Sequence, residues 1–371
     1  MAAFGGWEMP LEYSGGGVLK EHTAVRERVG LFDVSHLGKA MVQGPGAAAY
    51  VNRCLTNDLA RITAGQAQYT LCCDDGTGGV VDDLIAYLRG YDAVFLIPNA
   101  ANTGEVVWRL AATAPDEIEV VNRHRDYAVL AVQGTNSDEV LAELHLPVGH
   151  AYMSFLEVPF AGEPLIVCRT GYTGERGYEL VVPNTAAGEL WDALLSVGQE
   201  YGILPCGLGA RDTLRTEMGY ALHGQDISLE VTPVQARLGW AVGWNKSEFW
   251  GREALTAEKA SGPTRSLVGL SADGRGIPRP HMDVVDTDGQ VVGHVTSGTF
   301  SPTLRRGIGL ALVRADLAAS ATPALASRAP GASRESDGGV PDGLVYVDVR
   351  GRREAFTLTR PPFVDTSVRD S

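Results

Sequence analysis

Apolar positions recur along the chain with helical spacing in a few segments and with strand-like runs in many more. The segment Gly17–Val34 places its apolar residues near one helical face, and we expect that helix to end at Gly30. A second amphipathic helix is predicted over Ala187–Gly202. The predicted strands are Gly79–Tyr87, Ala93–Ile97, Tyr127–Gln133, Pro164–Arg169, Tyr178–Val182, Leu267–Leu270 and Gly307–Val313. Because helices and strands mix without regular βαβ alternation, the pattern favours an α+β fold.

The last third of the chain has a different pattern. After about Arg265, helical spacing becomes scarce and Gly/Pro turns recur, which predicts a separate all-β domain. Within it, Thr296–Leu304 (TSGTFSPTL) is expected to be a turn-rich segment before a strand. Ala318–Gly343 is rich in Ala, Ser, Gly and Pro, so we expect an exposed loop there.

Composition narrows the class of protein. The 371 residues exceed one compact core and indicate two or three domains, while 44% hydrophobic and 20% charged residues fit a globular chain. Apolar runs stay well below the length that a membrane span needs, so we expect no span. The first residues show neither the basic nor the apolar part of a secretory signal, so we expect no such signal. The five scattered cysteines predict a reducing compartment, and we expect a cytoplasmic protein. A net charge of −14 disfavours nucleic-acid binding.

Two adjacent aspartates interrupt the apolar run GGVVDDLIAY. Side chains of a strand alternate between faces, so Asp82 and Asp83 cannot both enter one pocket. The expected neighbours on each face are Val81, Ile85 and Tyr87 with Asp83, and Val80, Leu84 and Ala86 with Asp82. One carboxylate would then face an apolar surface, where burial raises its pKa and makes it a candidate proton acceptor. A turn cap or an arginine ion pair explains such residues more often, and the pattern does not choose between the two aspartates.

Two further segments carry candidate chemistry. RTGYTGERGYEL spaces glycines at 171, 174 and 177 without either common phosphate-loop spacing, so we expect a tight loop that delivers Glu179 to a pocket. GLGARDTLRTE predicts a helix start with Arg211 and Arg215 on one face, for which a solvated helix face is the plain alternative.

Other common catalytic patterns do not occur. The eight histidines form no metal-binding spacing, so we predict no metal and expect His36 and His223 to be structural. No serine or cysteine lies in a nucleophile motif.

Seven segments in one order resemble the folate-dependent aminomethyltransferases, the T-proteins of the glycine cleavage system. They are GGWEMPLEY, GLFDVSHLGK, GGVVDDLIAY, VQGTN, RTGYTGERGYEL, GLGARDTLRTEMGYALHGQD and TSGTFSPTLRRGIGLALV, with a weaker match at PPFVDTSVR. The seven run from Gly5 to Val313. The resemblance therefore covers nearly the whole chain.

The resemblance implies a three-domain cloverleaf around a central folate site, with two α+β domains built on ferredoxin-like or Greek-key sheets and a C-terminal barrel or jelly-roll domain. We expect the first domain to be discontinuous, with residues 1–38 and 127–264. The second would span residues 39–126 and carry Asp83, and the barrel would span residues 265–371.

The implied reaction transfers the methylene carbon of an aminomethyl group to tetrahydrofolate. The lipoyl arm of the H-protein carries that group, and the products are 5,10-methylenetetrahydrofolate and ammonia. Tetrahydrofolate would be the co-substrate and H-protein the partner. The alternatives are folate domains of sarcosine- and dimethylglycine-oxidising enzymes, a sulfonium demethylase and a folate-binding accessory protein of iron–sulfur enzymes. The last of these carries a KGCYxGQE motif, which is YALHGQD without the cysteine here.

The family's functional residues map onto this sequence. Asp83 matches the aspartate beside the reactive folate nitrogens, with Asp82 as its structural partner. Glu179 matches the glutamate that binds the pterin ring, and Arg211 matches a folate-binding arginine. The remaining matches line the pocket or meet the glutamate tail of folate, namely Tyr69, Tyr87, Leu37, Asn99 and Arg369.

The sequence departs from the family pattern at a few places. Leu37 stands where many members have Met, and Arg176 stands where an acidic residue is usual. The chain begins near the FGGWEMP segment, so we expect the leading stretch that helps to engage H-protein to be missing.

Overall fold

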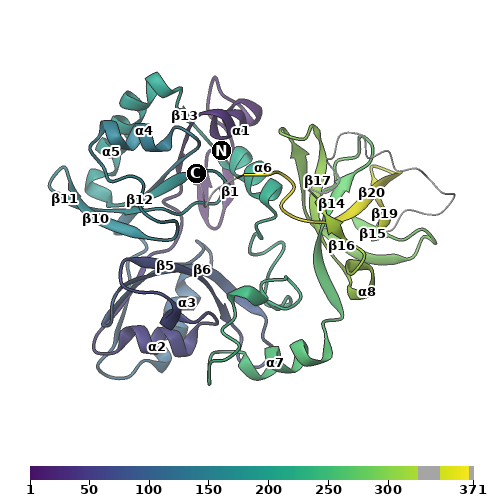
Figure 1. Ribbon diagram of the computed structural model, residues 1–371, viewed down its shortest axis with the longest axis horizontal. Coiled ribbons are helices and arrows are strands. Elements are labelled where there is room, and N and C mark those ends of the chain that lie inside the picture. Colours follow the sequence, from purple (N-terminus) through teal and green to yellow (C-terminus); the bar gives the residue numbers. More distant parts are fainter. Residues whose placement is uncertain (325–342, 367–371) are drawn as a thin grey trace. The chain divides into compact units, whose positions relative to one another are not determined.

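The structure is a computed structural model that describes residues 1–324 and 343–366. The described chain divides into two compact units. The first contains Met1–Arg211 and Trp240–Ala254, and the second contains Asp212–Gly239 and the described part of Leu255–Thr366. The second expected domain, residues 39–126, falls within the first unit, whereas residues 212–239 and 255–264 of the first expected domain belong to the second unit. The expected domain boundaries stay a prediction. Figure 1 labels many of the elements of both units.

A six-stranded sheet forms one half of the first unit. Its spatial order is β10 (Phe155–Phe160), β11 (Glu163–Cys168), β12 (Gly177–Pro183), β9 (Tyr127–Gln133), β3 (Gly30–Asp33) and β13 (Leu204–Pro205). All neighbours are antiparallel except β13 and β3. Apolar residues of helices α4 (Ser137–Glu143) and α5 (Asn184–Gly198) pack on this sheet in one buried cluster.

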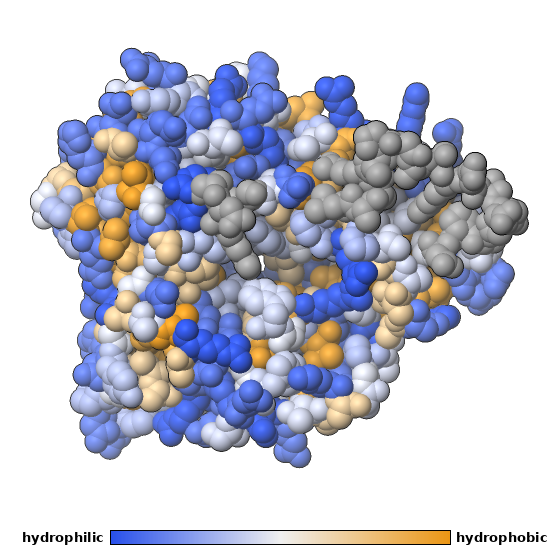
Figure 2. Space-filling model, viewed as in Figure 1, coloured by the Kyte–Doolittle hydropathy of each residue, from blue (hydrophilic) through white to orange (hydrophobic). Residues whose placement is uncertain are grey.

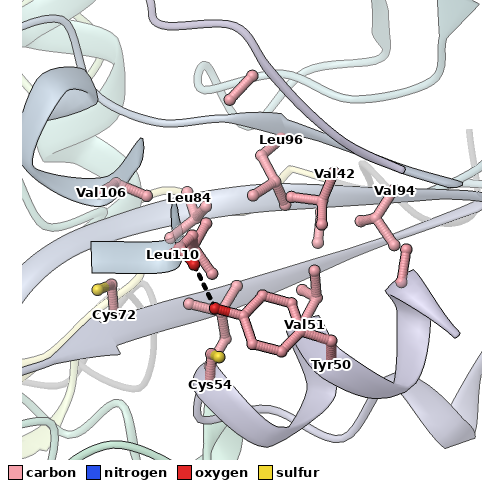
Figure 3. Packing of buried hydrophobic residues seen from close by; sticks show 14 of the residues in the cluster. Val42, Tyr50, Val51, Cys54, Cys72, Leu84, Val94, Leu96, Val106 and Leu110 are labelled. Atoms are coloured by element: carbon pink, nitrogen blue, oxygen red, sulfur yellow. Dashed lines mark hydrogen bonds between the residues drawn. The ribbon is translucent and has the colours of Figure 1, made fainter. Parts of the chain in front are cut away.

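A five-stranded antiparallel sheet forms the other half of the first unit. Its order is β5 (Gln66–Cys73), β6 (Val80–Gly90), β7 (Ala93–Ile97), β4 (Ala40–Gln43) and β8 (Glu119–Asn122). Its core is closed by helices α2 (Ala47–Cys54) and α3 (Thr103–Thr113), whose Val51 and Val106 are fully buried against strand residues such as Leu84. Figure 3 shows this cluster, in which the Tyr50 hydroxyl donates to the Leu110 carbonyl oxygen.

Smaller elements complete the first unit. They are β1 (Ala2–Phe4), β2 (Trp7–Met9), α1 (Val18–Glu27), the 3₁₀ turns Leu59–Arg61 and Gln199–Tyr201, and the start of α6 (Leu208–Met218). All five cysteines of the sequence lie in this unit, and each is unpaired and buried.

The second unit contains a closed six-stranded barrel. Its strands, in order around the barrel, are β14 (Arg265–Ala272), β17 (Arg306–Arg314), β16 (Val291–Ser301), β15 (Asp283–Val285), β19 (Leu344–Val349) and β20 (Arg352–Arg360). Pairing of β14 with β20 closes the ring, and the short β18 (Thr322–Pro323) adds to β20. Every barrel strand contributes to one apolar core. Helix α7 (Arg252–Ser261) precedes the barrel strands in sequence, and the short helix α8 (Ala315–Ala318) lies between β17 and β18.

The α+β class and the separate C-terminal β domain are confirmed, and several local predictions need correction. The first helix ends at Glu27 rather than Gly30, because Gly30 already begins strand β3. The segment Thr296–Ser301 is the end of the long strand β16 rather than a turn, since β17 pairs with it along its length. In the predicted Ala318–Gly343 loop, β18 is a short strand, and residues 325–342 lie outside the described part of the chain.

The visible surface is mostly hydrophilic, with scattered apolar residues, as Figure 2 shows. This distribution is ordinary for a globular chain. In the part of the chain that the structure describes, no helix is long and apolar enough to cross a membrane.

Candidate functional site

Strand β6 places the two aspartates in opposite environments. Asp82 is fully buried on the side of the apolar core, together with Leu84 and Ala86. Asp83 points to the other face and is half-buried. Val81, expected beside Asp83, instead belongs to the core, because a β-bulge opposite Cys72 and Cys73 shifts the register there.

Asp82 accepts hydrogen bonds from the segment between β7 and α3. Its carboxylate receives the Asn99 backbone N–H at 2.9 Å, the Asn99 side-chain amide at 2.9 Å and the Asn102 amide at 2.7 Å. Burial, followed by the charge of Asp83, raises the pKa of Asp82, whereas the amide donors oppose that shift. Asp82 thus ties the β7–α3 segment to strand β6, as expected of a structural partner.

Asp83 is held from two sides. The Tyr69 hydroxyl donates to one carboxylate oxygen at 3.1 Å, and the Asn99 amide donates to the other at 2.8 Å. Burial and then the charge of Asp83 raise the pKa of Tyr69 well above its usual value, so the phenol keeps its proton and remains a donor. These two hydrogen bonds fix the orientation of the Asp83 carboxylate. The side chain stays partly exposed on its face of the sheet.

An aromatic side chain from a distant segment covers Tyr69. Trp240 stacks on the Tyr69 ring with centroids 5.2 Å apart and planes 25° apart, while 62% of the Trp240 surface stays exposed. Two nearly parallel aromatic planes beside a carboxylate suit a flat heterocycle. The sequence reasoning missed Trp240, because no local pattern links residue 240 to strand β5.

Glu179 reaches its place through a glycine-rich hairpin loop. Strands β11 and β12 pair directly, with Cys168 opposite Glu179, and the loop 169–176 joins them. A Cβ atom at Gly171 would lie 2.1 Å from the nearest atom of the Gln133 side chain, and one at Gly177 would lie 2.6 Å from it. Gly174 has a φ of +81°, which favours glycine. The glycine spacing therefore serves close packing and one left-handed turn, and the loop is the tight connection that the sequence predicts.

A loop residue holds the Glu179 carboxylate in place. The Thr170 hydroxyl donates to its carboxylate at 2.5 Å. Burial raises the pKa of Glu179, and the Thr170 hydrogen bond and the charge of Arg211 oppose that shift. Thr170 also contacts the Tyr87 hydroxyl at 3.2 Å.

Tyr87 lies below the surface. It is only 1% exposed, and its ring meets Phe155 edge to face at 5.5 Å. Tyr87 comes from strand β6 of the five-stranded sheet, and Thr170 follows strand β11 of the six-stranded sheet. The Tyr87–Thr170–Glu179 series therefore joins the strand that carries Asp83 to the loop that carries Glu179.

Glu179 and Arg211 line one pocket in the first unit. The Arg211 guanidinium lies 4.4 Å from the centroid of the Tyr172 ring, a cation–π contact that fixes its position. The pocket is lined by Phe32, Val34, Ala131, Gln133, Tyr172, Thr173, Glu179 and Arg211. The cavity itself, at about 10 Å³, has room for about one water. The arginine, carboxylate and aromatic rings at this place are nevertheless the groups that recognise acidic groups, N–H donors and flat rings of a ligand.

The remaining predicted site residues have simpler places. Leu37 is half-buried in the connection between β3 and β4, and Asn99 binds both aspartates. Arg369 lies outside the described residues. The sequence reasoning missed Thr170, Tyr172 and Asn102, although the first two stand inside the matched segment RTGYTGERGYEL.

The two arginines of helix α6 differ in role. Arg215 is 1% exposed and pairs with Asp212 and Asp226 within the second unit, so the solvated-face alternative is wrong for it.

Among the described residues, no group of three or more His, Cys, Asp or Glu side chains is placed to hold a metal ion. The absence of a metal stays a prediction.

Comparison with known families identifies both parts of the chain. Residues 1–246 match the model described as the GCVT N-terminal domain, and residues 265–365 match the glycine cleavage T-protein C-terminal barrel domain. An aminomethyltransferase of Parafrankia is 61% identical over 99% of this chain and 94% of its own length. An aminomethyltransferase of Mycobacterium tuberculosis is 54% identical over the same shares of the two chains.

A solved structure shares the fold. The glycine cleavage system aminomethyltransferase T from Bartonella henselae matches with a TM-score of 0.84 and 33% identity, over 98% of this chain and 93% of that one. The fold and these matches define the chain as a transferase enzyme with an α+β part and a C-terminal barrel. More narrowly, it belongs to the glycine cleavage T-protein family and is an aminomethyltransferase. Membership implies folate as co-substrate.

Proposed function

We propose that the first unit binds tetrahydrofolate between Asp83 and Glu179 and accepts the methylene carbon of an aminomethyl group there. The lipoyl arm of an H-protein would present that group, and 5,10-methylenetetrahydrofolate and ammonia would leave. The residues present fit a folate. Its pterin has adjacent N–H groups that need acceptors, and its tail is anionic.

Tetrahydrofolate supplies the nitrogens that take up the one-carbon unit. Asp83 would accept a hydrogen bond from such a nitrogen, and its negative charge would stabilise positive charge that develops near it. Because Tyr69 and Asn99 already fix both oxygens of Asp83, no side-chain reorganisation is needed when the ligand binds.

Glu179 and Arg211 would orient the ligand. The Glu179 carboxylate would accept the pterin N–H groups, with Thr170 holding the carboxylate in place. Arg211 and the flat rings of Tyr172 and Trp240 would contact the ligand's planar and acidic parts. Arg369, outside the described residues, is proposed for the glutamate tail.

One observation carries the proposal most directly. Of two adjacent aspartates, only Asp83 faces away from the apolar core, and it does so with both oxygens oriented by neutral donors. Asn99 and Asn102 satisfy the carboxylate of Asp82 on the core side. The carboxylate of Asp83 lies on the opposite face of the strand, where it can also accept from the N–H donors of a ligand, and this supports the proposal.

The test compares the Asp83→Asn variant with the parent enzyme. Asparagine keeps the shape and removes the charge, so we expect folate affinity within a few-fold of the parent and loss of most turnover. Turnover is measured as ammonia and methylenetetrahydrofolate formed from aminomethylated H-protein and tetrahydrofolate. Asp116→Asn, an exposed change in the same half of the unit, is the matched control and should keep full activity. Near-parental turnover of Asp83→Asn would contradict the role of Asp83.

The partner and the location are proposed on separate grounds. H-protein follows from the aminomethyl carrier that the reaction needs. The chain has a net charge of −14, so an acidic partner would need a local basic patch, and the exposed Arg305 and Arg306 are candidates.

A cytoplasmic location rests on the unpaired cysteines.

A further inference from the structure

The chain passes between the two sheets of the first unit at two adjacent places. Residues 34–39, the first crossover, lead from β3 into β4, and residues 123–126, the second crossover, lead from β8 into β9. Strand β3 pairs with β9 in the six-stranded sheet, and β4 pairs with β8 in the five-stranded sheet. The first of these sheets carries Glu179 and the second carries Asp83, so the crossovers connect the two halves of the candidate site.

A fully buried lysine binds the first crossover. Lys39 is 0% exposed, and its ammonium group donates to the Ser35 carbonyl oxygen at 2.9 Å and to the Leu37 carbonyl oxygen at 2.8 Å. Both acceptors are backbone groups of the turn itself. Hydrogen bonds from a charged donor are about twice as strong as neutral ones, so this contact closes the turn firmly.

The second crossover binds the same turn. His124 Nε2 donates to the carbonyl oxygen of His36 at 2.9 Å, and the Arg123 backbone N–H donates to the Lys39 carbonyl oxygen at 2.8 Å. Three consecutive carbonyls, those of residues 35 to 37, therefore each accept a hydrogen bond from Lys39 or His124.

The first crossover also touches the segment that holds the aspartates. The Gly38 N–H donates to the Pro98 carbonyl oxygen at 2.8 Å. A Cβ atom at Gly38 would lie 2.0 Å from Thr103 Oγ1, and that hydroxyl donates to the Asn99 carbonyl oxygen at 2.9 Å. Asn99 in turn binds both Asp82 and Asp83.

We propose that Lys39 is a positioning residue, whose ammonium group holds the first crossover so that Leu37 and the Asn99-bound Asp83 keep a fixed place relative to Glu179. The proposal deepens the proposed function and rests on it for the ligand. Lys39 does not touch the reacting atoms, and it acts through the two backbone carbonyls that it binds.

The charges around Lys39 are consistent with this role. Burial lowers the pKa of Lys39 to about 8, while Asp33 at the end of β3 and Asp126 in the second crossover oppose the shift. Burial also lowers the pKa of His36 to about 3 and lowers that of His124, so both neighbouring imidazoles are neutral at pH 7. The charges of Arg211 and Arg125 also act on these imidazoles, on His36 and on His124 respectively. Among the groups around the first crossover that titrate near neutrality, the Lys39 ammonium is the one that loses its charge as the pH rises through about 8.

The test replaces Lys39 with methionine in the full chain. Methionine keeps the length and apolar character of the stem and removes the ammonium. At pH 7 we expect amide-exchange protection over residues 34–39 and 123–126 to fall by about tenfold, and tetrahydrofolate to bind about tenfold more weakly. In the parent enzyme the opened turn, whose Lys39 has its ordinary pKa of 10.5, binds more protons than the closed turn. The same protection should therefore rise as the pH passes 8, and the variant should lack that step.

Two further variants keep the outcome decisive. Lys20→Met changes an exposed lysine of α1 and should alter neither readout. His124→Phe removes a second hydrogen bond to the turn and should lower protection of residues 34–39 even if Lys39→Met does not fold. Unchanged protection in a folded variant, or lower protection with unchanged tetrahydrofolate affinity, overturns the proposal. Exchange is read without folate, so failure of the parent enzyme to bind tetrahydrofolate would reject the proposed function separately.

Discussion

Asp82 and Asp83 have the same chemistry and one peptide bond between them, yet their surroundings differ completely. Strand geometry turns one side chain into the apolar core and the other away from it. The core-facing carboxylate is matched by three N–H donors, and the other by one phenol and one amide. The first set of donors ties strand β6 to the segment before helix α3, and the second set orients the carboxylate that we propose for the ligand.

Removal of the Glu179 carboxylate should weaken folate binding. In Glu179→Ala the pterin N–H groups would lose their acceptor, and we expect binding to weaken by about 1–3 kcal/mol. Calorimetric titration with tetrahydrofolate measures the loss. Glu189→Ala, an exposed change on helix α5, is the control and should leave the affinity unchanged. Parental affinity in Glu179→Ala would refute the assigned contact.

At the residue scale, sequence alone predicted part of this site. Alternation predicted that the two aspartates face opposite sides of the strand, as the structure shows. The family resemblance selected Asp83 as the ligand-facing one, and that choice stays a prediction. The hydrogen bonds from Tyr69 and Asn99 could not be predicted, because they depend on strand pairing and on the bulge beside Val81. Trp240 is separated from Tyr69 by about half of the chain, and no local pattern records such a contact.

At the scale of elements, the segment Trp240–Ala254 is part of the first unit although barrel-unit residues surround it in sequence. A half-buried lysine fixes it there. Lys246 donates to the carbonyl oxygens of Leu55 at 2.6 Å and Asn57 at 3.0 Å, in the connection between α2 and β5. The Thr56 hydroxyl donates to the Ala241 carbonyl oxygen at 2.9 Å in the same place.

Lys246 should give stability a measurable pH dependence. Burial lowers its pKa from 10.5 to about 8. Between those values the unfolded chain binds more protons than the folded chain, so the Lys246 contribution to the free energy of unfolding rises with pH. We expect parent-minus-variant stability for Lys246→Met to rise by about 1–3 kcal/mol from pH 8 to pH 10.

Urea unfolding at several pH values measures this difference. Lys259→Met changes an exposed lysine of helix α7, and its difference from the parent should stay flat across the same range. A flat difference for Lys246→Met, or one that falls with pH, would contradict the argument.

For the whole molecule, sequence patterns predicted the correct α+β class, the all-β character of the last third and five of the eleven strands in the two sheets of the first unit. They did not show that β14 and β20, about 90 residues apart, close a barrel, because closure depends on pairing between distant strands. Nor did they show that helix α6 crosses the boundary between the units, with Arg211 in the first and Arg215 in the second.

Arg215 should be essential to the stability of the second unit. It binds Asp212, Asp226 and the Ser297 hydroxyl, and Asp226 is fully buried. Arg215→Met would leave that buried carboxylate without its cation, and we expect a loss of about 3–5 kcal/mol in the free energy of unfolding.

Chemical denaturation, followed by amide exchange of β16, measures this loss. Arg314→Met in the same unit breaks an exposed ion pair with Asp316 and should cost much less stability than Arg215→Met. The double variant Arg215→Met with Asp226→Leu should recover part of the stability. A cost for Arg215→Met as small as that of the control would show that the buried pair is dispensable.

The distribution of the cysteines has a practical consequence. All five lie in the first unit, all are buried, and burial raises the pKa of each thiol, to about 11 for Cys54. Thiolates are the species that alkylating reagents attack, so the native chain should resist such reagents. The rate of cysteine alkylation therefore measures how often the first unit opens. It requires no engineered label, and the barrel does not contribute to the signal.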